Sequence, residues 1–154
     1  MSKYYLAYGS NLSIKQMSIR TPDARIIGTG ILHDWQLLFR KYATIRKNKN
    51  FETPVLVWEI SKKDERNLDR YEGFPRSYIK KNLTLPVTSL NGDNLGKLKA
   101  MVYIMTPEAV KNRSLDPVPD INYFSVIDEG YTVFNFDKRI LKAALEDSFQ
   151  VLML

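Results

Sequence analysis

Short segments with strand character, each bounded by turn residues, constrain the fold of this chain more than any other feature of its sequence. The first segment, Tyr4–Tyr8, is apolar and aromatic and ends at Gly9. In later segments apolar side chains such as Trp35 and Leu37 alternate with others, which is the period of a half-buried strand. These later segments are residues 25–32, 34–45, 54–60, 78–87 and 97–105. With no linker or internal repeat in between, we predict one α+β domain over residues 1–154.

Turn and capping residues place the helices around these strands. Asn91-Gly92-Asp93 predicts a hairpin turn between the last two strands. The clearest helix covers residues 61–71, because Ser61 and Asp64 form a capping-box-like start and Gly73 supplies a stop. Further helices are predicted near residues 13–19, where Gln16 follows Ser13 by three positions, at 107–113, around 121–130 and around 137–149.

The residues that the chain lacks exclude much familiar catalytic chemistry. The sequence contains no cysteine and one histidine, His33. Thiol nucleophiles, thiolate zinc sites and histidine-cluster metal sites are therefore excluded. His33 lies far in sequence from the motifs described below, so we interpret it as a surface or packing residue. The acid–base groups that remain are carboxylates, lysines and tyrosines, and we expect an enzyme built from this sequence to work with a carboxylate.

A formal net charge of +6 would suit a nucleic acid, an acidic membrane surface or an anionic small molecule. The densest basic stretch, residues 40–49, falls on a predicted strand and the turn after it, and elsewhere bases interleave with acids, as in 62–66. Such mixing is typical of a solvated face, and no nucleic-acid-binding motif accompanies it, so nucleic acid is the less favoured partner. No stretch approaches the roughly 20 apolar residues that cross a bilayer, and no export signal is evident, so we expect a cytoplasmic protein without a membrane partner.

A first candidate site is Tyr8-Gly9-Ser10-Asn11, at a predicted strand-to-helix junction. Gly9 permits close approach of the backbone to a ligand, and the helix that follows begins with unpaired N–H groups that attract a carboxylate or phosphate. Ser10 and Asn11 add polar side chains. The alternative is a plain turn with a capping residue.

A second candidate is Glu72, which immediately precedes Gly73 at the C-terminal end of the clearest helix. That end carries a partial negative charge, so a carboxylate there is disfavoured and its pKa should rise. The aromatic neighbours Tyr71 and Phe74 could desolvate the carboxylate and raise its pKa further. A residue that breaks a local rule in this way is a functional candidate, and the alternative is a glutamate that faces water.

Together the two motifs resemble the γ-glutamylcyclotransferase-like superfamily. Members have a strand running into Tyr-Gly-Ser-Asn-Leu near the N-terminus, followed by Leu-Asp-x-x-Glu-Gly, which here is Leu68 to Gly73. The resemblance continues through Tyr78, five residues after that glycine, through Tyr103 in a late strand and through Tyr123, Ile127 and Gly130. It covers nearly the whole chain, and the two motifs in this order are more specific than either one alone.

The resemblance implies a mixed β-sheet curled into a barrel-like core, flanked by short helices, with a pocket at one end. It implies that the loop of Tyr8, Gly9, Ser10 and Asn11 holds a γ-glutamyl group, largely through backbone N–H donors. By the same resemblance Glu72 is the catalytic acid–base, and Tyr78 and Tyr123 line the pocket. The implied reaction is the attack of the substrate's own α-amine on its γ-carbonyl, which releases 5-oxoproline and needs no metal or cofactor.

Several pocket positions depart from the family pattern. Ser77 stands where many members have glycine, Asp120 follows Pro119 where serine is common, and Tyr131 replaces a small residue. These differences leave the γ-glutamyl substrate, either an amino acid or an amine derivative, undetermined. The oligomeric state is open as well. Two other functions remain as alternatives: a non-catalytic small-molecule-binding domain of the same fold and, less favoured, a basic nucleic-acid-binding protein.

Overall fold

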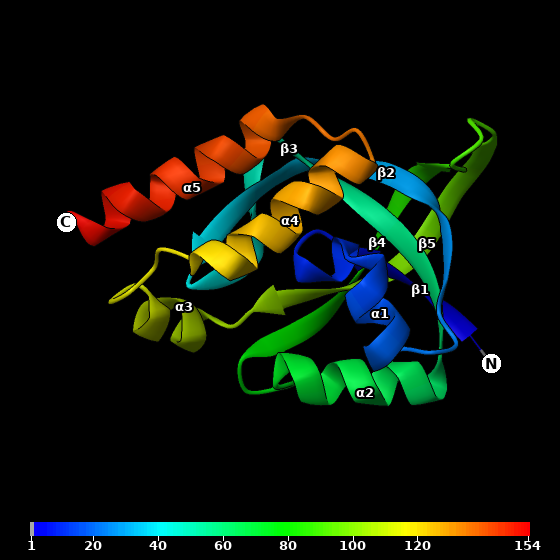
Figure 1. Ribbon diagram of the computed structural model, residues 1–154, viewed down its shortest axis with the longest axis horizontal. Coiled ribbons are helices and arrows are strands. Elements are labelled where there is room, and N and C mark those ends of the chain that lie inside the picture. The colour runs from blue at the N-terminus through cyan, green and yellow to red at the C-terminus, as the bar shows by residue number, and fades with distance from the viewer. Residues whose placement is uncertain (1) are drawn as a thin grey trace.

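The computed structural model describes residues 2–154, and at its centre a five-stranded sheet closes on itself (Figure 1). The strands are β1 (Ser2–Ala7), β2 (Arg25–Arg40), β3 (Tyr42–Ser61), β4 (Tyr78–Thr88) and β5 (Asn94–Met105). Around the ring they follow the order β1-β3-β2-β4-β5. The strand pairs are antiparallel except for β1 and β5, which run parallel.

The ring is not a regular barrel, because two of its junctions are narrow. Strands β1 and β5 are paired at one position, Tyr5 with Met101, and strands β2 and β4 are paired at Thr29 with Thr88. The other junctions are long ladders. The predicted fold class, a mixed sheet curled into a barrel-like core with flanking helices, is confirmed.

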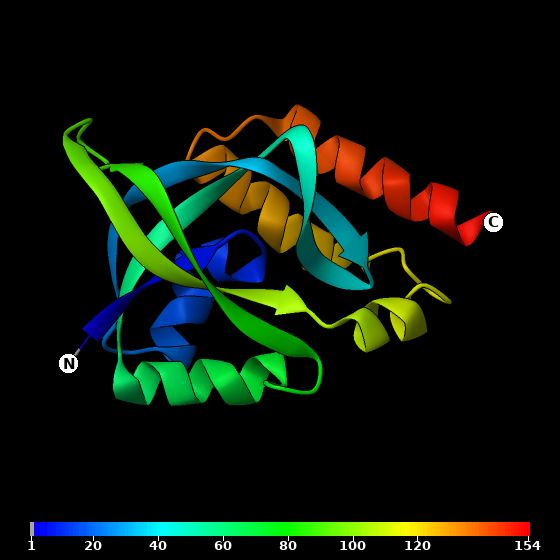
Figure 2. The same ribbon diagram turned by 180° about the vertical axis from the view of Figure 1, so that it is seen from behind.

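Helices cover the ring on one side and at one end. They are η1 (Ser10–Leu12), α1 (Ile14–Arg20), α2 (Lys62–Glu72), α3 (Pro107–Arg113), α4 (Ile121–Val133) and α5 (Lys138–Leu152). Helices α4 and α5 lie together on one side of the sheet, and the view from behind brings strands β4 and β5 to the front (Figure 2). Helix α2 lies along one end. Each helix predicted from the sequence is present within a few residues of its predicted bounds.

The prediction of one strand over residues 34–45 is wrong. The chain reverses at Lys41, whose φ of 65° lies in the left-handed region, and Arg40 pairs with Tyr42 across the reversal. Long-range contacts hold this conformation: the Lys41 N–H donates to the Pro117 carbonyl at 2.7 Å, and its ammonium group lies 2.9 Å from Asp120. Strand β3 then continues through residues 46–49, which we predicted to lie in a turn, and through residues 50–53, which belonged to no predicted element.

Local signals elsewhere are confirmed. The hairpin between β4 and β5 turns at residues 89–93, where Gly92 has a φ of 93°. Ser61 caps α2 by accepting from the N–H of Asp64, and the Asp64 carboxylate accepts from the N–H of Ser61 in return. Gly73 ends the same helix in the left-handed conformation. The helix that carries Glu72 therefore begins and ends where its own sequence directs.

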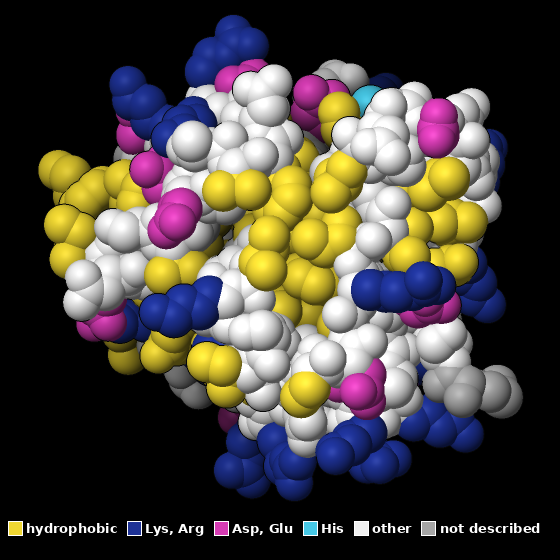
Figure 3. Space-filling model, turned by 45° about the vertical axis from the view of Figure 1, so that its right-hand side comes forward, with side chains coloured by type: hydrophobic (Ala, Val, Ile, Leu, Met, Phe, Trp, Pro, Cys, Tyr) yellow, Lys and Arg dark blue, Asp and Glu magenta, His cyan; other side chains and the backbone are white. Residues whose placement is uncertain are grey.

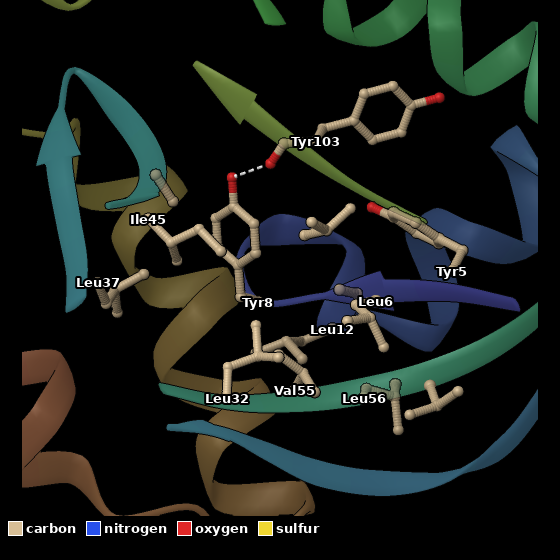
Figure 4. Packing of buried hydrophobic residues seen from close by; sticks show 14 of the residues in the cluster. Tyr5, Leu6, Tyr8, Leu12, Leu32, Leu37, Ile45, Val55, Leu56 and Tyr103 are labelled. Atoms are coloured by element: carbon tan, nitrogen blue, oxygen red, sulfur yellow. Dashed lines mark hydrogen bonds between the residues drawn. The ribbon is translucent and has the colours of Figure 1, made fainter. Parts of the chain in front are cut away.

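The hydrophobic core fills the ring and supports the loop that follows β1 (Figure 4). Leu12, at the end of that loop, is almost fully buried and lies against Gly130 of α4. A Cβ at Gly130 would come within 2.6 Å of the Leu12 Cβ, so helix and loop meet at a distance that requires glycine. Figure 4 also shows the Tyr8 hydroxyl meeting the Tyr103 carbonyl across the core.

Candidate active site

Glu72 is the last residue of α2, and the packing of that helix fixes its place. Leu68, one turn earlier, is fully buried and anchors the helix to the core. The Glu72 side chain is partly buried, and burial raises the pKa of its carboxyl to about 7, opposed by the positive charges of Arg20 and Arg113. The predicted upward direction agrees with this value. Tyr71 and Phe74 are both exposed, and neither lines the inner pocket described below, although Tyr71 lines the outer cleft together with Glu72.

The loop after β1 presents its backbone to the same place. Gly9 lies close to strand β3 and α4: a Cβ there would come within 3.1 Å of Ala43 and 3.7 Å of the Tyr123 hydroxyl. Among residues 2–154, no acceptor pairs with the backbone N–H groups of Gly9, Ser10 or Asn11, whereas the Leu12 N–H donates to the Gly9 carbonyl. Three neighbouring donors are thus available to an anionic group.

Asn11 has a different position from the one expected of a ligand-binding side chain. Its amide nitrogen donates to the Tyr5 hydroxyl at 2.9 Å, and its amide oxygen accepts from Arg20 at 2.8 Å. Its backbone carbonyl accepts from the Trp58 indole at 3.1 Å. The side chain is buried and holds the loop in shape, so only its backbone N–H is free for a ligand.

Five tyrosines surround Glu72, and their hydroxyl groups divide into two classes. Tyr8 donates its proton to the Tyr103 carbonyl, Tyr78 donates to the Ala43 carbonyl, and Tyr103 donates to Asp69. By contrast, the hydroxyl groups of Tyr5 and Tyr123 accept hydrogen bonds, from Asn11 and from the Ala43 N–H respectively. A hydroxyl that accepts keeps its own proton for another partner.

Burial raises the pKa of all five phenols, so each hydroxyl keeps its proton at neutral pH. Tyr5 and Tyr123 are therefore hydrogen-bond donors available to a ligand, and Tyr8 and Tyr78 offer acceptors only.

These groups line two connected spaces. The inner pocket has a volume of about 30 Å³, room for about two waters or one carboxylate. All seven residues predicted as site residues line it: Tyr8, Gly9, Ser10, Asn11, Glu72, Tyr78 and Tyr123. The outer cleft has a volume of about 320 Å³ and shares Ser10, Glu72, Tyr78 and Tyr123 with the inner pocket. Glu72 thus stands where the pocket opens into the cleft.

The sequence did not single out several residues that line these spaces. Tyr5 and Ala43 belong to the inner pocket, and Tyr42, Arg70 and Arg113 to the outer cleft. The alternation of β1 does not indicate Tyr5, because Tyr5 and Leu6 lie on opposite faces of the strand and both line the inner pocket. Nothing local marks Tyr42 or Arg113, which reach the cleft through the reversal at Lys41 and the path of α3.

A charged network joins α2 to strands β4 and β5 beside the inner pocket. Asp69, one turn before Glu72, accepts from the Tyr103 hydroxyl at 2.6 Å and from Lys80 at 2.9 Å. Lys80 also donates to Glu65 at 2.6 Å. Figure 4 shows the Tyr103 ring directed toward α2, away from its own carbonyl. The motif Leu-Asp-x-x-Glu-Gly therefore places the carboxylate of Asp69 in this network and the carboxylate of Glu72 in the pocket.

The basic stretch at residues 40–49 does not form one continuous surface. Arg40 is buried and lies 2.7 Å from Asp147, and Lys41 is paired with Asp116 and Asp120. On the face shown in Figure 3, Lys and Arg side chains lie mainly around the edge, with acidic side chains between them. His33 is exposed and lines neither the pocket nor the cleft. Within residues 2–154, no helix is long and apolar enough to span a bilayer.

Comparison with known families gives one match over most of the chain. The sequence profile of the family described as "Gamma-glutamyl cyclotransferase, AIG2-like" matches residues 5–124, a range that contains the loop, Glu72 and Tyr123. No curated protein sequence gives a significant match.

Solved structures with the same fold span nearly the whole chain. A structure named gamma-glutamyl cyclotransferase has a TM-score of 0.69 at 22% identity, covering 98% of this chain and 86% of its own. An uncharacterized protein of Homo sapiens gives a TM-score of 0.67 at 22% identity, with coverage of 97% and 86%. An AIG2-like protein of Mus musculus gives a TM-score of 0.54 at 18% identity, with coverage of 71% and 82%. At these identities the likeness is one of fold.

Proposed function

The chain belongs to the gamma-glutamyl cyclotransferase, AIG2-like family, and from that membership we propose that it is itself a cyclotransferase that releases 5-oxoproline from a γ-glutamyl amino acid or a γ-glutamyl amine. The observation that carries the proposal is the placement of Glu72. A carboxyl group with a pKa of about 7 stands at the junction of a carboxylate-sized pocket and a longer cleft. A group with such a pKa can both accept and return a proton near neutral pH.

The reaction needs two protons to move from the attacking nitrogen to the departing one, and it needs no nucleophile from the protein. The α-ammonium of the substrate, with a reference pKa of about 8, gives a proton to the Glu72 carboxylate. The free amine then attacks the γ-carbonyl carbon, and a new C–N bond closes the five-membered ring. Glu72 gives its proton to the departing nitrogen as the original amide C–N bond breaks, and it then carries a second proton from the ring nitrogen to the freed amine, which leaves as an ammonium. Proton transfer of this kind accelerates a reaction by about 10²–10⁴-fold.

The donors around Glu72 supply the remaining requirements. The pocket has room for the α-carboxylate of the γ-glutamyl group, beside the N–H groups of Gly9, Ser10 and Asn11. A clamp on this carboxylate bends the substrate so that its amine approaches its own carbonyl, which lowers the entropic part of the barrier. The Tyr123 hydroxyl, whose proton is uncommitted, is a donor for the oxyanion that develops on the γ-carbonyl.

The experiment is a 5-oxoproline assay over a panel of γ-glutamyl amino acids and amines, with the wild type and the variant Glu72→Gln. Gln keeps the shape of the side chain but cannot transfer the proton, so we expect a loss of activity of at least about 10²-fold. Glu129→Gln, an exposed position on α4, is the matched control and should keep full activity. Full activity in Glu72→Gln would contradict the assignment. Binding without release from any compound would leave a non-catalytic binding domain.

A further inference from the structure

Three polar side chains form a chain of hydrogen bonds from the end of α1 to the inner pocket. The Arg20 guanidinium donates to the Asn11 amide oxygen at 2.8 Å, and the Asn11 amide nitrogen donates to the Tyr5 hydroxyl at 2.9 Å. Arg20 is the last residue of α1, and Tyr5 lines the inner pocket. Neither Arg20 nor the Tyr5 hydroxyl takes part in the reaction proposed above.

The direction of both hydrogen bonds follows from the chemistry of arginine. A guanidinium has N–H donors and no acceptor, so the atom of Asn11 that Arg20 contacts must be the amide oxygen. The amide nitrogen then faces Tyr5, and because this nitrogen can only donate, the Tyr5 hydroxyl must accept. The Tyr5 proton is therefore not used in this bond, and among residues 2–154 it has no other acceptor.

The unused proton of Tyr5 lies at the inner pocket. Tyr5 is 4% exposed, and the pocket beside it has a volume of about 30 Å³, room for one carboxylate. Figure 4 shows the Tyr5 hydroxyl directed toward Tyr8, whose own hydroxyl already donates to the Tyr103 carbonyl. Burial raises the pKa of Tyr5, so the proton stays on the oxygen at neutral pH. A buried donor without an acceptor is uncommon, and a ligand carboxylate can supply the acceptor.

Contacts with α2 hold Arg20 in place. Its guanidinium carbon lies 3.3 Å from the ring centre of Tyr71, and its backbone carbonyl accepts from Asn67 at 3.1 Å. Both partners belong to the helix that ends at Glu72. Because these contacts keep the guanidinium beside Asn11, turning the amide over would set one N–H group against another.

We propose that Tyr5 donates a hydrogen bond to the α-carboxylate of the γ-glutamyl group, and that Arg20 and Asn11 are positioning residues that keep the Tyr5 proton turned toward the pocket. The proposal rests on the proposed cyclotransferase function and adds a binding residue to it. A hydroxyl that donates to a carboxylate forms a charge-assisted hydrogen bond, which is stronger than a neutral one. Without Arg20 the Asn11 amide would be free to turn over, and Tyr5 would then donate to Asn11 instead of to the ligand.

The variant Asn11→Asp tests the direction of the hydrogen bond, because aspartate has nearly the same shape and no donor. Its carboxylate still accepts from Arg20 and also accepts from the Tyr5 hydroxyl, so the Tyr5 proton is withdrawn from the pocket. Tyr5→Phe removes the same proton altogether. Calorimetry in the Glu72→Gln background, where turnover does not interfere, should show that each variant binds γ-glutamyl-alanine about 10- to 100-fold more weakly.

Two comparisons separate the reversed hydrogen bond from the added negative charge. With Tyr5→Phe already present, no proton remains to be withdrawn, so adding Asn11→Asp should have a much smaller effect than it has alone. An analogue of γ-glutamyl-alanine whose α-carboxylate is a carboxamide should lose less affinity in Tyr5→Phe than the parent compound does. Unchanged affinity in Tyr5→Phe, equal losses for the two ligands, or an Asn11→Asp effect of the same size in both backgrounds would overturn the proposal.

Two variants of Arg20 test whether it acts as an obligate donor. Lysine also can only donate, whereas glutamine can present its oxygen and so let the Asn11 amide turn over. Arg20→Lys should therefore keep more of the affinity for γ-glutamyl-alanine than Arg20→Gln does. Equal losses in the two would contradict the positioning role of Arg20, because both variants lose the stacking on Tyr71.

The same measurements separate this proposal from the proposed function. The expected pattern of affinities, together with no 5-oxoproline release by the wild type, would support the Tyr5 site and contradict the cyclotransferase activity. Release by the wild type, together with unchanged affinity in Tyr5→Phe, would contradict the Tyr5 site alone. If Asn11→Asp fails to fold, the two ligands in Tyr5→Phe and the two variants of Arg20 decide.

Discussion

Tyr78 and Tyr123 both form hydrogen bonds with the backbone of Ala43 in strand β3. The Tyr78 hydroxyl donates to the Ala43 carbonyl at 2.8 Å, and the Tyr123 hydroxyl accepts from the Ala43 N–H at 3.0 Å. The two phenols therefore have opposite roles toward a ligand, although both line the pocket. The proton of Tyr78 is committed to the protein, and the proton of Tyr123 is free.

This difference predicts different effects for two variants that each remove one hydroxyl. Tyr123→Phe removes the donor that we propose for the oxyanion, so we expect kcat/KM to fall by about 10²-fold. Tyr78→Phe leaves the buried Ala43 carbonyl without a partner, which costs about 1–3 kcal/mol of stability, but kcat/KM should change less than about tenfold. Activity assays and chemical unfolding of both variants test the distinction. Equal losses of activity in the two would contradict it.

The pH dependence of the reaction should report Glu72. Only the ionised carboxylate can accept a proton from the substrate, so kcat/KM should rise about tenfold per pH unit below a midpoint near pH 7. Above the midpoint Glu72 is ionised, and its titration should no longer change kcat/KM. Arg113 lowers the pKa of Glu72, so Arg113→Gln should move this midpoint to higher pH. Arg70→Gln is the matched control and should not move it. A profile that is flat between pH 5 and about 8 would contradict the role of Glu72.

The position of Glu72 was predictable because the signals that fix it are local. Ser61 and Asp64 start α2, Gly73 ends it, and all three lie within a dozen residues of the carboxylate. The signals that fix the loop after β1 are local in the same sense, since Gly9 follows a strand and begins a turn. Physical rules that act over a few residues were sufficient for both.

The outer cleft could not be predicted, because it depends on contacts between distant segments. Tyr42 reaches the cleft only because Lys41 takes a left-handed conformation, and the Pro117 carbonyl that pairs with Lys41 lies far along the chain. Arg113 ends a short helix with no sequence feature that distinguishes it from the other surface bases. The side chain of Asn11 pairs with Tyr5 and Arg20, and its backbone carbonyl pairs with Trp58 of strand β3; only the packing of these segments brings the partners together.

Protein stability should also depend on the ionisation of Glu72. The pKa of this group is about 7 in the folded protein against an ordinary value of 4.5, so between these values the folded state binds more protons than the unfolded state. Its contribution to stability is fully present below pH 4.5 and is lost as the pH rises through 7. Relative to Glu72→Gln, the wild type should lose up to about 3 kcal/mol of unfolding free energy across that range.

Urea unfolding at several pH values, with wild type and Glu72→Gln side by side, measures this difference. The contribution of all other groups cancels in the comparison, because only position 72 differs. A difference that stays constant from pH 4 to about 8 would mean that the carboxyl has an ordinary pKa in the folded protein.

Because Gly130 of α4 and Leu12 are in close contact, a larger residue at position 130 should disturb the loop after β1. In Gly130→Ala the new methyl group would lie 2.6 Å from the Leu12 Cβ, so either α4 or the loop must move. Overpacking of this kind costs about 1–3 kcal/mol, and movement of the loop displaces the N–H groups of Gly9 and Ser10. We expect kcat/KM to fall by at least about tenfold, because a small misplacement of binding groups is costly in catalysis.

The double variant Gly130→Ala with Leu12→Ala relieves the contact and should recover activity relative to Gly130→Ala, although the cavity it leaves keeps stability low. Ser125→Ala, exposed on the same helix, is the control for helix propensity and should change neither quantity. If Gly130→Ala lowers stability but leaves kcat/KM intact, α4 moves instead of the loop, and the prediction is wrong.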